Sequence, residues 1–174
     1  MGRSDIVTVK GGPVTLVGNK IKVGMEAPVF KVLDADLEEV SLDVFDGKTK
    51  LIASVPSLDT PVCDLQIKRF NDEAASVGKD IVILFISMDL PFAQDRWCTL
   101  SKVDSFYMLS DHRDASFGEA YGVLIKDIRL LSRAVFIADE DNILKYVEYC
   151  DEIYSHVDYT SSLEAASRLA ENTQ

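Results

Sequence analysis

The 174-residue chain has little positive charge, because 18 lysines and arginines stand against 29 aspartates and glutamates. The formal net charge is −11 at pH 7. Proteins that bind nucleic acid or anionic membranes present a basic face, so this balance argues against both partners. The sequence also lacks an apolar run of the roughly 18 residues that a membrane span needs. The acidity is most simply explained as a contribution to solubility.

Targeting signals and paired cysteines are also scarce. The first residues, MGRSDIVTVK, contain no apolar core of the secretory type, and Ile6 stands where a myristoylation site has serine or threonine. We therefore expect a cytoplasmic location. Three cysteines are too few, and an odd number, for a disulfide scaffold. In a reducing compartment each cysteine is then either buried filler or a reactive centre.

Hydrophobic periodicity predicts an α/β domain with helices on a mixed sheet. Apolar residues alternate on both sides of Gly11-Gly12, which predicts a β-hairpin over about residues 5–18. Residues 49–57 and 80–87 are expected to be strands, and a helix is expected between them, ending at Gly78. A strand, a helix and a strand in this order form a βαβ unit, so the two strands should be parallel. The apolar face of the helix is Ile67, Phe70, Ala74 and Val77.

The second half of the chain continues this alternation of helices and strands. The predicted elements are a helix over 90–103, a strand over 105–111, a short helix over 115–123 and two strands within 133–150. A final helix is expected to begin at Ser161, which would form a capping box with Glu164. We find no repeat or linker, so residues 1–174 are expected to form a single domain.

Cys63 lies at a chemically special position in this scheme. It comes just after the first strand of the βαβ unit and at the start of the helix, the end of the sheet where ligands bind in open α/β folds. A helix N-terminus offers unpaired N–H groups and a partial positive charge, and both stabilise a thiolate. Such surroundings lower the pKa of cysteine thiols from about 8.5 to about 3.5–7.5. We therefore expect Cys63 to be a nucleophilic thiolate at neutral pH.

The residues around Cys63 agree with this role without proving it. Pro56 and Pro61 stiffen the turn, and Thr60 can place its hydroxyl over the first turn of the helix. The geometry alone leaves an alternative open, in which Thr60 only caps the helix and Cys63 is an inert core residue.

The stretch PSLDTPVC at residues 56–63 matches the PxxxTxxC signature of the peroxiredoxins. Together with MDLPFAQDRWC at residues 88–98, it resembles the atypical two-cysteine subgroup, the bacterial thiol peroxidases. The resemblance extends from the hairpin around KGGPVTL, through AYGV and RAVFIADEDN, to the last helix. It implies a thioredoxin-like fold with an N-terminal hairpin.

The resemblance also implies roles for individual residues. Cys63 would be the peroxidatic cysteine, whose thiolate attacks a hydroperoxide and becomes a sulfenic acid. Thr60 and Arg133 would donate hydrogen bonds to the thiolate and the peroxide, and Pro56 would shield the pocket from water. Without the motif, Arg133 would be taken for a surface charge at the end of a strand.

Cys98 carries over as the resolving cysteine, which would form an intramolecular disulfide with Cys63. A disulfide needs Cα atoms within about 7 Å, and the two residues belong to separate predicted helices, so we expect local unwinding around both on oxidation. The expected partners are a hydroperoxide, with organic hydroperoxides favoured by family precedent, and thioredoxin or a similar dithiol reductant. The resemblance further implies a homodimer and requires no cofactor or metal.

Other functions remain open at this stage. The Cys63–Cys98 pair would also suit a redox sensor without turnover, and a plain binding module could keep the fold without catalysis. Cys150 has no counterpart in the family pattern; it is expected to be a buried structural cysteine whose thiol pKa is raised by Asp151 and Glu152. His112 and His156 stand alone in the sequence, and His112 is expected to be a solvated loop residue, because no second soft ligand stands at a metal-binding spacing from it.

Overall fold

The computed structural model describes residues 2–77 and 81–171, and a mixed β-sheet forms its centre. In the described part of the chain this sheet has seven strands, in the order β11-β10-β5-β6-β7-β3-β4. Its middle is the predicted βαβ unit, in which β5 (Thr49–Ser54) and β6 (Ile81–Ser87) are parallel and are connected through α1 (Pro61–Val77). Gly78, the predicted end of the helix, lies outside the described residues.

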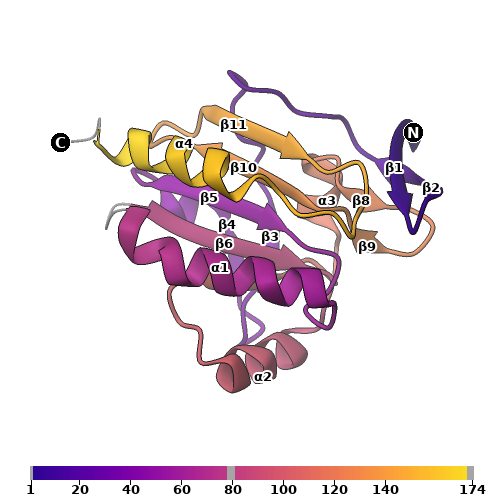
Figure 1. Cartoon of the computed structure of the whole chain (residues 1–174), viewed down its shortest axis with the longest axis horizontal. Coiled ribbons are helices and arrows are strands. Elements are labelled where there is room, and N and C mark those ends of the chain that lie inside the picture. Colours follow the sequence, from indigo (N-terminus) through magenta and orange to yellow (C-terminus); the bar gives the residue numbers. More distant parts are fainter. Residues whose placement is uncertain (1, 78–80, 172–174) are drawn as a thin grey trace.

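Two helices, α1 and α4 (Tyr159–Glu171), cover one face of the sheet. Helix α1 begins near the edge at which the parallel strands end. Helix α4 lies beside α1 across β5 and β10 (Figure 1). Side chains of each strand alternate between the two faces, because successive residues of a strand point to opposite sides. Leu51 and Phe85 pack under α1 and α4 with Phe70, and Ile52 and Leu84 belong to the core on the other face.

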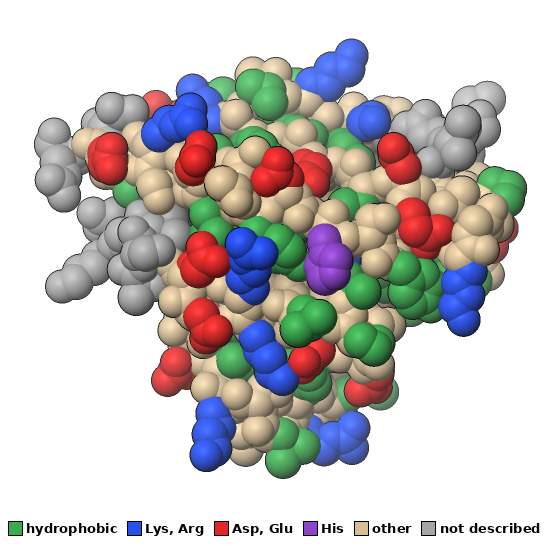
Figure 2. All heavy atoms as spheres, viewed as in Figure 1, with side chains coloured by type: hydrophobic (Ala, Val, Ile, Leu, Met, Phe, Trp, Pro, Cys, Tyr) green, Lys and Arg blue, Asp and Glu red, His purple; other side chains and the backbone are tan. Residues whose placement is uncertain are grey.

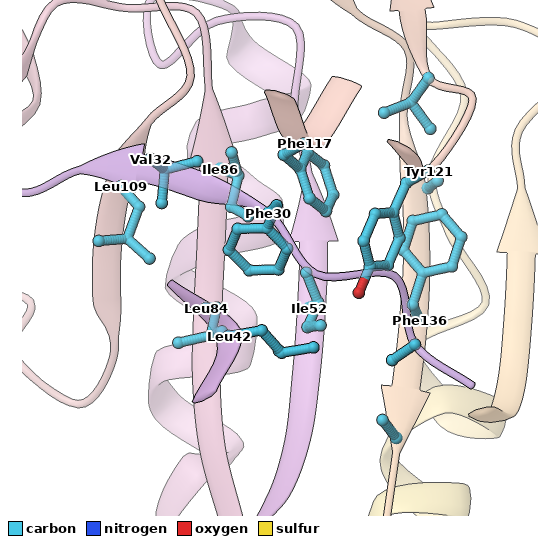
Figure 3. Packing of buried hydrophobic residues seen from close by; sticks show 14 of the residues in the cluster. Phe30, Val32, Leu42, Ile52, Leu84, Ile86, Leu109, Phe117, Tyr121 and Phe136 are labelled. Atoms are coloured by element: carbon cyan, nitrogen blue, oxygen red, sulfur yellow. The ribbon is translucent and has the colours of Figure 1, made fainter. Parts of the chain in front are cut away.

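Aromatic rings fill the core on the far side of the sheet. Phe30, Phe117, Tyr121 and Phe136 lie against one another beside Ile52 (Figure 3). Phe30 meets Phe117 edge to face with ring centroids 5.3 Å apart, and Tyr121 meets Phe136 at 5.0 Å. The hydroxyl of Tyr121 is buried in this cluster, and it has no hydrogen-bond partner among the described residues.

The other predicted elements of the second half are also present. Strand β10 pairs antiparallel with both β5 and β11, so the arginine that precedes it stands beside the end of β5. Helix α2 comes directly after the turn that follows β6, with proline at its first position, as the sequence predicts. The bounds are α2 (Pro91–Ser101), β7 (Tyr107–Ser110), α3 (Ser116–Ala120), β10 (Ala134–Ala138) and β11 (Leu144–Tyr149).

The predicted hairpin forms, and it belongs to a second sheet. Strands β1 (Gly2–Val9) and β2 (Gly12–Val17) are antiparallel, and Lys10 and Gly11 turn the chain with φ values of 51° and 79°. Positive φ at both turn positions gives a twist that matches the strands. The segment before Arg133 extends this sheet through β8 (Leu124–Ile125) and β9 (Leu130–Leu131), which the sequence analysis did not predict.

Three further elements have no counterpart in the prediction. They are β3 (Lys31–Leu33), β4 (Glu39–Ser41) and the short 3₁₀-helix η1 (Leu42–Phe45). Strand β3 pairs with β7 and β4, and β4 forms the edge of the central sheet.

The predicted capping box of the last helix is wrong. Helix α4 begins at Tyr159, and the carboxylate of Asp158 accepts hydrogen bonds from the Ser161 N–H at 2.9 Å and the Ser161 hydroxyl at 2.7 Å. Asp158 is therefore the N-cap. Glu164 instead pairs with Arg168 one turn later, at 3.0 Å.

The face formed by α1 and α4 mixes charges of both signs. Figure 2 shows acidic and basic side chains interspersed over this face, with hydrophobic side chains between them, and no single-sign patch. None of the helices within the described residues is both long and apolar enough to cross a membrane.

Candidate active site

The loop after β5 leads into α1 and places Cys63 in the first turn of that helix. The strand ends at Ser54 and the helix begins at Pro61, so Cys63 is its third residue and has no exposed surface. Amide groups of a first helical turn have no acceptor within the helix, and their partial positive charge favours an anion. The predicted placement of Cys63 at a helix N-terminus is confirmed.

Two predicted partners contact the sulfur of Cys63. The hydroxyl oxygen of Thr60 lies 2.6 Å from Cys63 Sγ, and Arg133 Nη2 donates to the same sulfur at 3.2 Å. Thr60 comes from the loop directly before α1, and Arg133 comes 70 residues after Cys63, from the position just before β10. The antiparallel pairing of β10 with β5 brings these two distant segments together. A hydroxyl and a guanidinium converging on one sulfur are able to stabilise negative charge there.

Arg133 is held in place by a fork of hydrogen bonds. Only 1% of its surface is exposed, and its Nε and Nη2 donate to the carbonyl oxygen of Ile153 at 3.0 and 2.9 Å. Its Nη1 donates to Gln66 Oε1. A guanidinium keeps its charge in a protein. The hydrogen bonds to Ile153 and Gln66 orient this buried cation toward Cys63. The alternative of a surface charge at a strand end is wrong for Arg133.

The sulfur lies in a buried and largely apolar part of the molecule. Pro56 is buried in the loop before α1, and Leu58 is buried in the same cluster as Cys63 and Phe70. A low-dielectric environment strengthens the hydrogen bonds from Thr60 and Arg133 to the sulfur. The arrangement combines a buried thiol with two hydrogen-bond donors.

Cys98 lies apart from this cluster, on α2. Its side chain is half-buried and lines a cavity of about 440 Å³ together with Phe45, Phe106 and Tyr107. Burial, aided by the negative charge of Asp95, raises the pKa of the Cys98 thiol to about 11. None of the three cysteines, all of which are described, forms a disulfide. As it stands, Cys98 is therefore a protonated thiol outside the Cys63 cluster.

Comparison with known proteins identifies the family of this chain. Residues 22–165 match the Redoxin family. The thiol peroxidase of Bacillus subtilis (strain 168) is 53% identical over 163 residues, which cover 94% of this chain and 97% of the relative. This chain belongs to the thiol peroxidases of the Redoxin family. Another member, from Halalkalibacterium halodurans, is 51% identical over 160 residues and covers 92% of this chain and 96% of its own length.

Solved structures agree with the predicted thioredoxin-like fold of this thiol peroxidase. A peroxiredoxin-like protein from Aquifex aeolicus is 38% identical, with a TM-score of 0.87 over 94% of this chain and 96% of that chain. The thiol peroxidase from Chromobacterium violaceum has a TM-score of 0.83 over 98% of each chain. At 22% identity, that second likeness speaks for the fold alone.

Gln66 is a member of the site that the sequence analysis missed. It is fully buried on α1, one turn after Cys63, and accepts the hydrogen bond from Arg133 Nη1. Its Nε2 has no hydrogen-bond partner among the described residues. The available signal was a glutamine three residues after Cys63, a spacing that places both on one face of a helix. The carbonyl of Ile153 had no sequence signal, because it is a backbone group.

Cys150 and the histidines differ in detail from the prediction. Cys150 is buried, and the pKa of its thiol is raised to about 11, mainly by burial and then by Glu148, with Arg133 opposing and Asp151 adding a smaller effect. The direction of the predicted shift agrees, but burial and Glu148 contribute more than Asp151, and the predicted effect of Glu152 is not among the causes. His156 is exposed, with Nδ1 2.9 Å from the Tyr159 hydroxyl, whereas His112, expected to be a solvated loop residue, is half-buried in a turn. Within the described residues no cluster of three or more His, Cys, Asp or Glu side chains is placed to hold a metal ion.

Proposed function

We propose that this thiol peroxidase reduces hydroperoxides with Cys63 as the attacking group. The supporting observation is the convergence of Thr60 and Arg133 on Cys63 Sγ, at 2.6 and 3.2 Å. The thiolate attacks the terminal oxygen of ROOH and the O–O bond breaks. The leaving RO⁻ takes up a proton and departs as an alcohol, or as water from hydrogen peroxide, and Cys63 becomes a sulfenic acid.

Thr60 and Arg133 act on the charge that moves during this step. Negative charge passes from the sulfur to the leaving oxygen, so donors aimed at the sulfur are also within reach of the peroxide. Pro56 excludes water from the reacting groups. The first step then needs no separate base, because the hydrogen bonds from Thr60 and Arg133 favour the anionic form of the attacking sulfur.

Cys98 completes the cycle in this proposal. Its thiol attacks the sulfenic sulfur of Cys63, which gives an intramolecular disulfide and releases water. Because Cys63 sits in α1 and Cys98 in α2, both α2 and the first turn of α1 unwind before the two sulfurs meet. A thioredoxin-like dithiol then reduces the disulfide and is itself oxidised.

The setting of the reaction is part of the same proposal. Residues 1–174 act as one redoxin domain, organic hydroperoxides are preferred over hydrogen peroxide, and the chain works as a homodimer. The cytoplasm is the proposed location, because dithiol reductants are maintained there.

A coupled assay tests this function. Cumene hydroperoxide, thioredoxin, its reductase and NADPH are mixed with the protein, and NADPH consumption is followed. Sustained consumption that is lost in Cys63→Ser supports the peroxidase. Cys98→Ser should consume one equivalent of peroxide and then stall. A single stoichiometric oxidation of the wild type without turnover would instead identify a redox sensor, and no reaction at all would leave a binding module.

A further inference from the structure

A carboxylate outside the proposed catalytic set connects the segment before α1 with the segment before α2. Asp89 follows the end of β6 and precedes the first residue of α2 by two positions. Its carboxylate accepts three hydrogen bonds, from the Ser57 hydroxyl at 2.8 Å, the Leu58 N–H at 2.9 Å and the Ser87 hydroxyl at 2.8 Å. Two of these donors belong to the loop that leads to Cys63.

The bond to Ser57 continues as a short chain of contacts to the reactive sulfur. The carbonyl oxygen of Ser57 accepts the Thr60 N–H at 3.2 Å and lies 3.1 Å from the Thr60 hydroxyl. That hydroxyl lies 2.6 Å from Cys63 Sγ. A hydroxyl has one proton. The proton of Thr60 points to Ser57 when the sulfur is a thiol and to the sulfur when it is a thiolate, and the bond from the Thr60 N–H to the Ser57 carbonyl holds the residue in both cases.

Asp89 is connected to α2 and β7 through the Ser87 hydroxyl. The Ser87 hydroxyl that donates to Asp89 accepts a hydrogen bond from Gln94 Nε2 at 3.0 Å, and Gln94 also donates to the carbonyl of Leu109 at 2.9 Å. Gln94 is buried in the first turn of α2. The network therefore includes β6, β7 and the start of the helix that carries Cys98.

We propose that Asp89 is a positioning residue that holds the loop before α1 in the conformation in which Thr60 contacts Cys63, and whose release frees that loop for disulfide formation. The proposal rests on the proposed function, which needs two arrangements of this loop. In the first, Cys63 lies under Thr60 and Arg133. In the second, Cys63 has left its buried place to reach Cys98. The bonds of Asp89 to Ser57 and Leu58 stabilise the first arrangement only.

This role predicts opposite effects on the two half-reactions. Weakening the hydrogen bonds from Ser57 and Leu58 to Asp89 makes the contact between Thr60 and Cys63 less frequent, so peroxide oxidises Cys63 more slowly. The same change makes the unwound loop more frequent, so the disulfide forms faster once the sulfenic acid exists. A residue that only supports the fold would slow both steps or neither.

The test is Asp89→Asn, which keeps the size of the side chain but replaces one accepting oxygen by a donating amide. Oxidation of Cys63 by cumene hydroperoxide is measured in single turnover in the Cys98→Ser background, and disulfide formation is measured with all cysteines present. We expect Cys63 oxidation to fall about tenfold, which corresponds to about 1.4 kcal/mol, and disulfide formation to rise. Irreversible oxidation of Cys63 to sulfinic acid at high peroxide should decrease, since the sulfenic acid is consumed sooner.

Two further variants keep the test decisive. Asp114→Asn makes the same exchange at an exposed aspartate that pairs with Arg113, and it should leave both half-reactions unchanged. Ser57→Ala removes one of the three bonds to the carboxylate and should shift both rates in the same directions as Asp89→Asn, by less. Parallel loss of both rates in Asp89→Asn, or rates equal to the wild type, would overturn the proposal. A wild type and an Asp114→Asn variant that both fail to reduce peroxide would instead refute the proposed function.

Discussion

Replacing Arg133 with lysine is expected to slow the oxidation of Cys63 by about 10- to 100-fold. Lysine retains the positive charge but carries it on one ammonium group, whereas the guanidinium contacts Ile153, Gln66 and Cys63 through three different nitrogens. Hydrogen bonds to charged groups are worth about 1.5–3 kcal/mol, and about 1.4 kcal/mol is tenfold in rate. Losing the contact to Cys63 Sγ alone accounts for the expected range.

The substitution also affects stability, and the assay has to separate the two effects. Ile153 O or Gln66 Oε1 is left without its donor in the Arg133→Lys variant, and each such buried group costs about 1–3 kcal/mol. Urea denaturation establishes that the variant is folded under assay conditions. The second-order rate constant for Cys63 oxidation is then measured by stopped flow in the Cys98→Ser background.

A matched control is Arg168→Lys, because Arg168 is 74% exposed on α4 and pairs only with Glu164 in the described contacts. Its rate constant should equal that of the parent protein. A folded Arg133→Lys variant that oxidises Cys63 within twofold of the parent would refute the idea that the direction of the guanidinium, beyond its charge, accelerates the reaction.

Three further predictions concern the fold. Asp158→Ala should lower the free energy of unfolding by about 1 kcal/mol, because Asp158 caps α4 through Ser161, and urea denaturation that finds no loss would contradict the cap. Tyr121→Phe should leave that free energy unchanged or raise it, because the hydroxyl has no partner among the described residues; a loss above about 1 kcal/mol would show that a bond is made there. Burial raises the pKa of Asp111 from 3.8 to about 6, so its ionisation destabilises the folded state. As the pH rises from about 4 to about 6, the wild type should lose stability relative to Asp111→Asn, on the order of 3 kcal/mol; parallel stability curves would rule out this shift.

Long periodic segments made the centre of the fold predictable. The unbroken apolar run of β6 and the 3-4 spacing of α1 each extend over several residues, and together they imply a parallel pair. Strands β3 and β9 escaped prediction because they have three and two residues, too few to show a period, and exist through pairing with distant partners.

The candidate site was predictable to the extent that a motif marks it. Cys63, Thr60 and Arg133 come together as the resemblance implied, although Arg133 lies 70 residues from Cys63. Gln66 and Asp89 were missed because a polar residue in a helix or a turn has no distinctive pattern. Only the packing of the chain shows that one holds the guanidinium and the other binds the loop.

The most direct test of the account is the ionisation of Cys63 as a function of pH. Thiolate absorbance and alkylation rate are followed in a variant in which Cys98 and Cys150 are replaced by serine, so that the signal belongs to one sulfur. The account predicts that Cys63 is mostly thiolate at pH 7 and that Arg133→Lys moves its titration to higher pH. A Cys63 that is still protonated at pH 7 in the folded protein would contradict it.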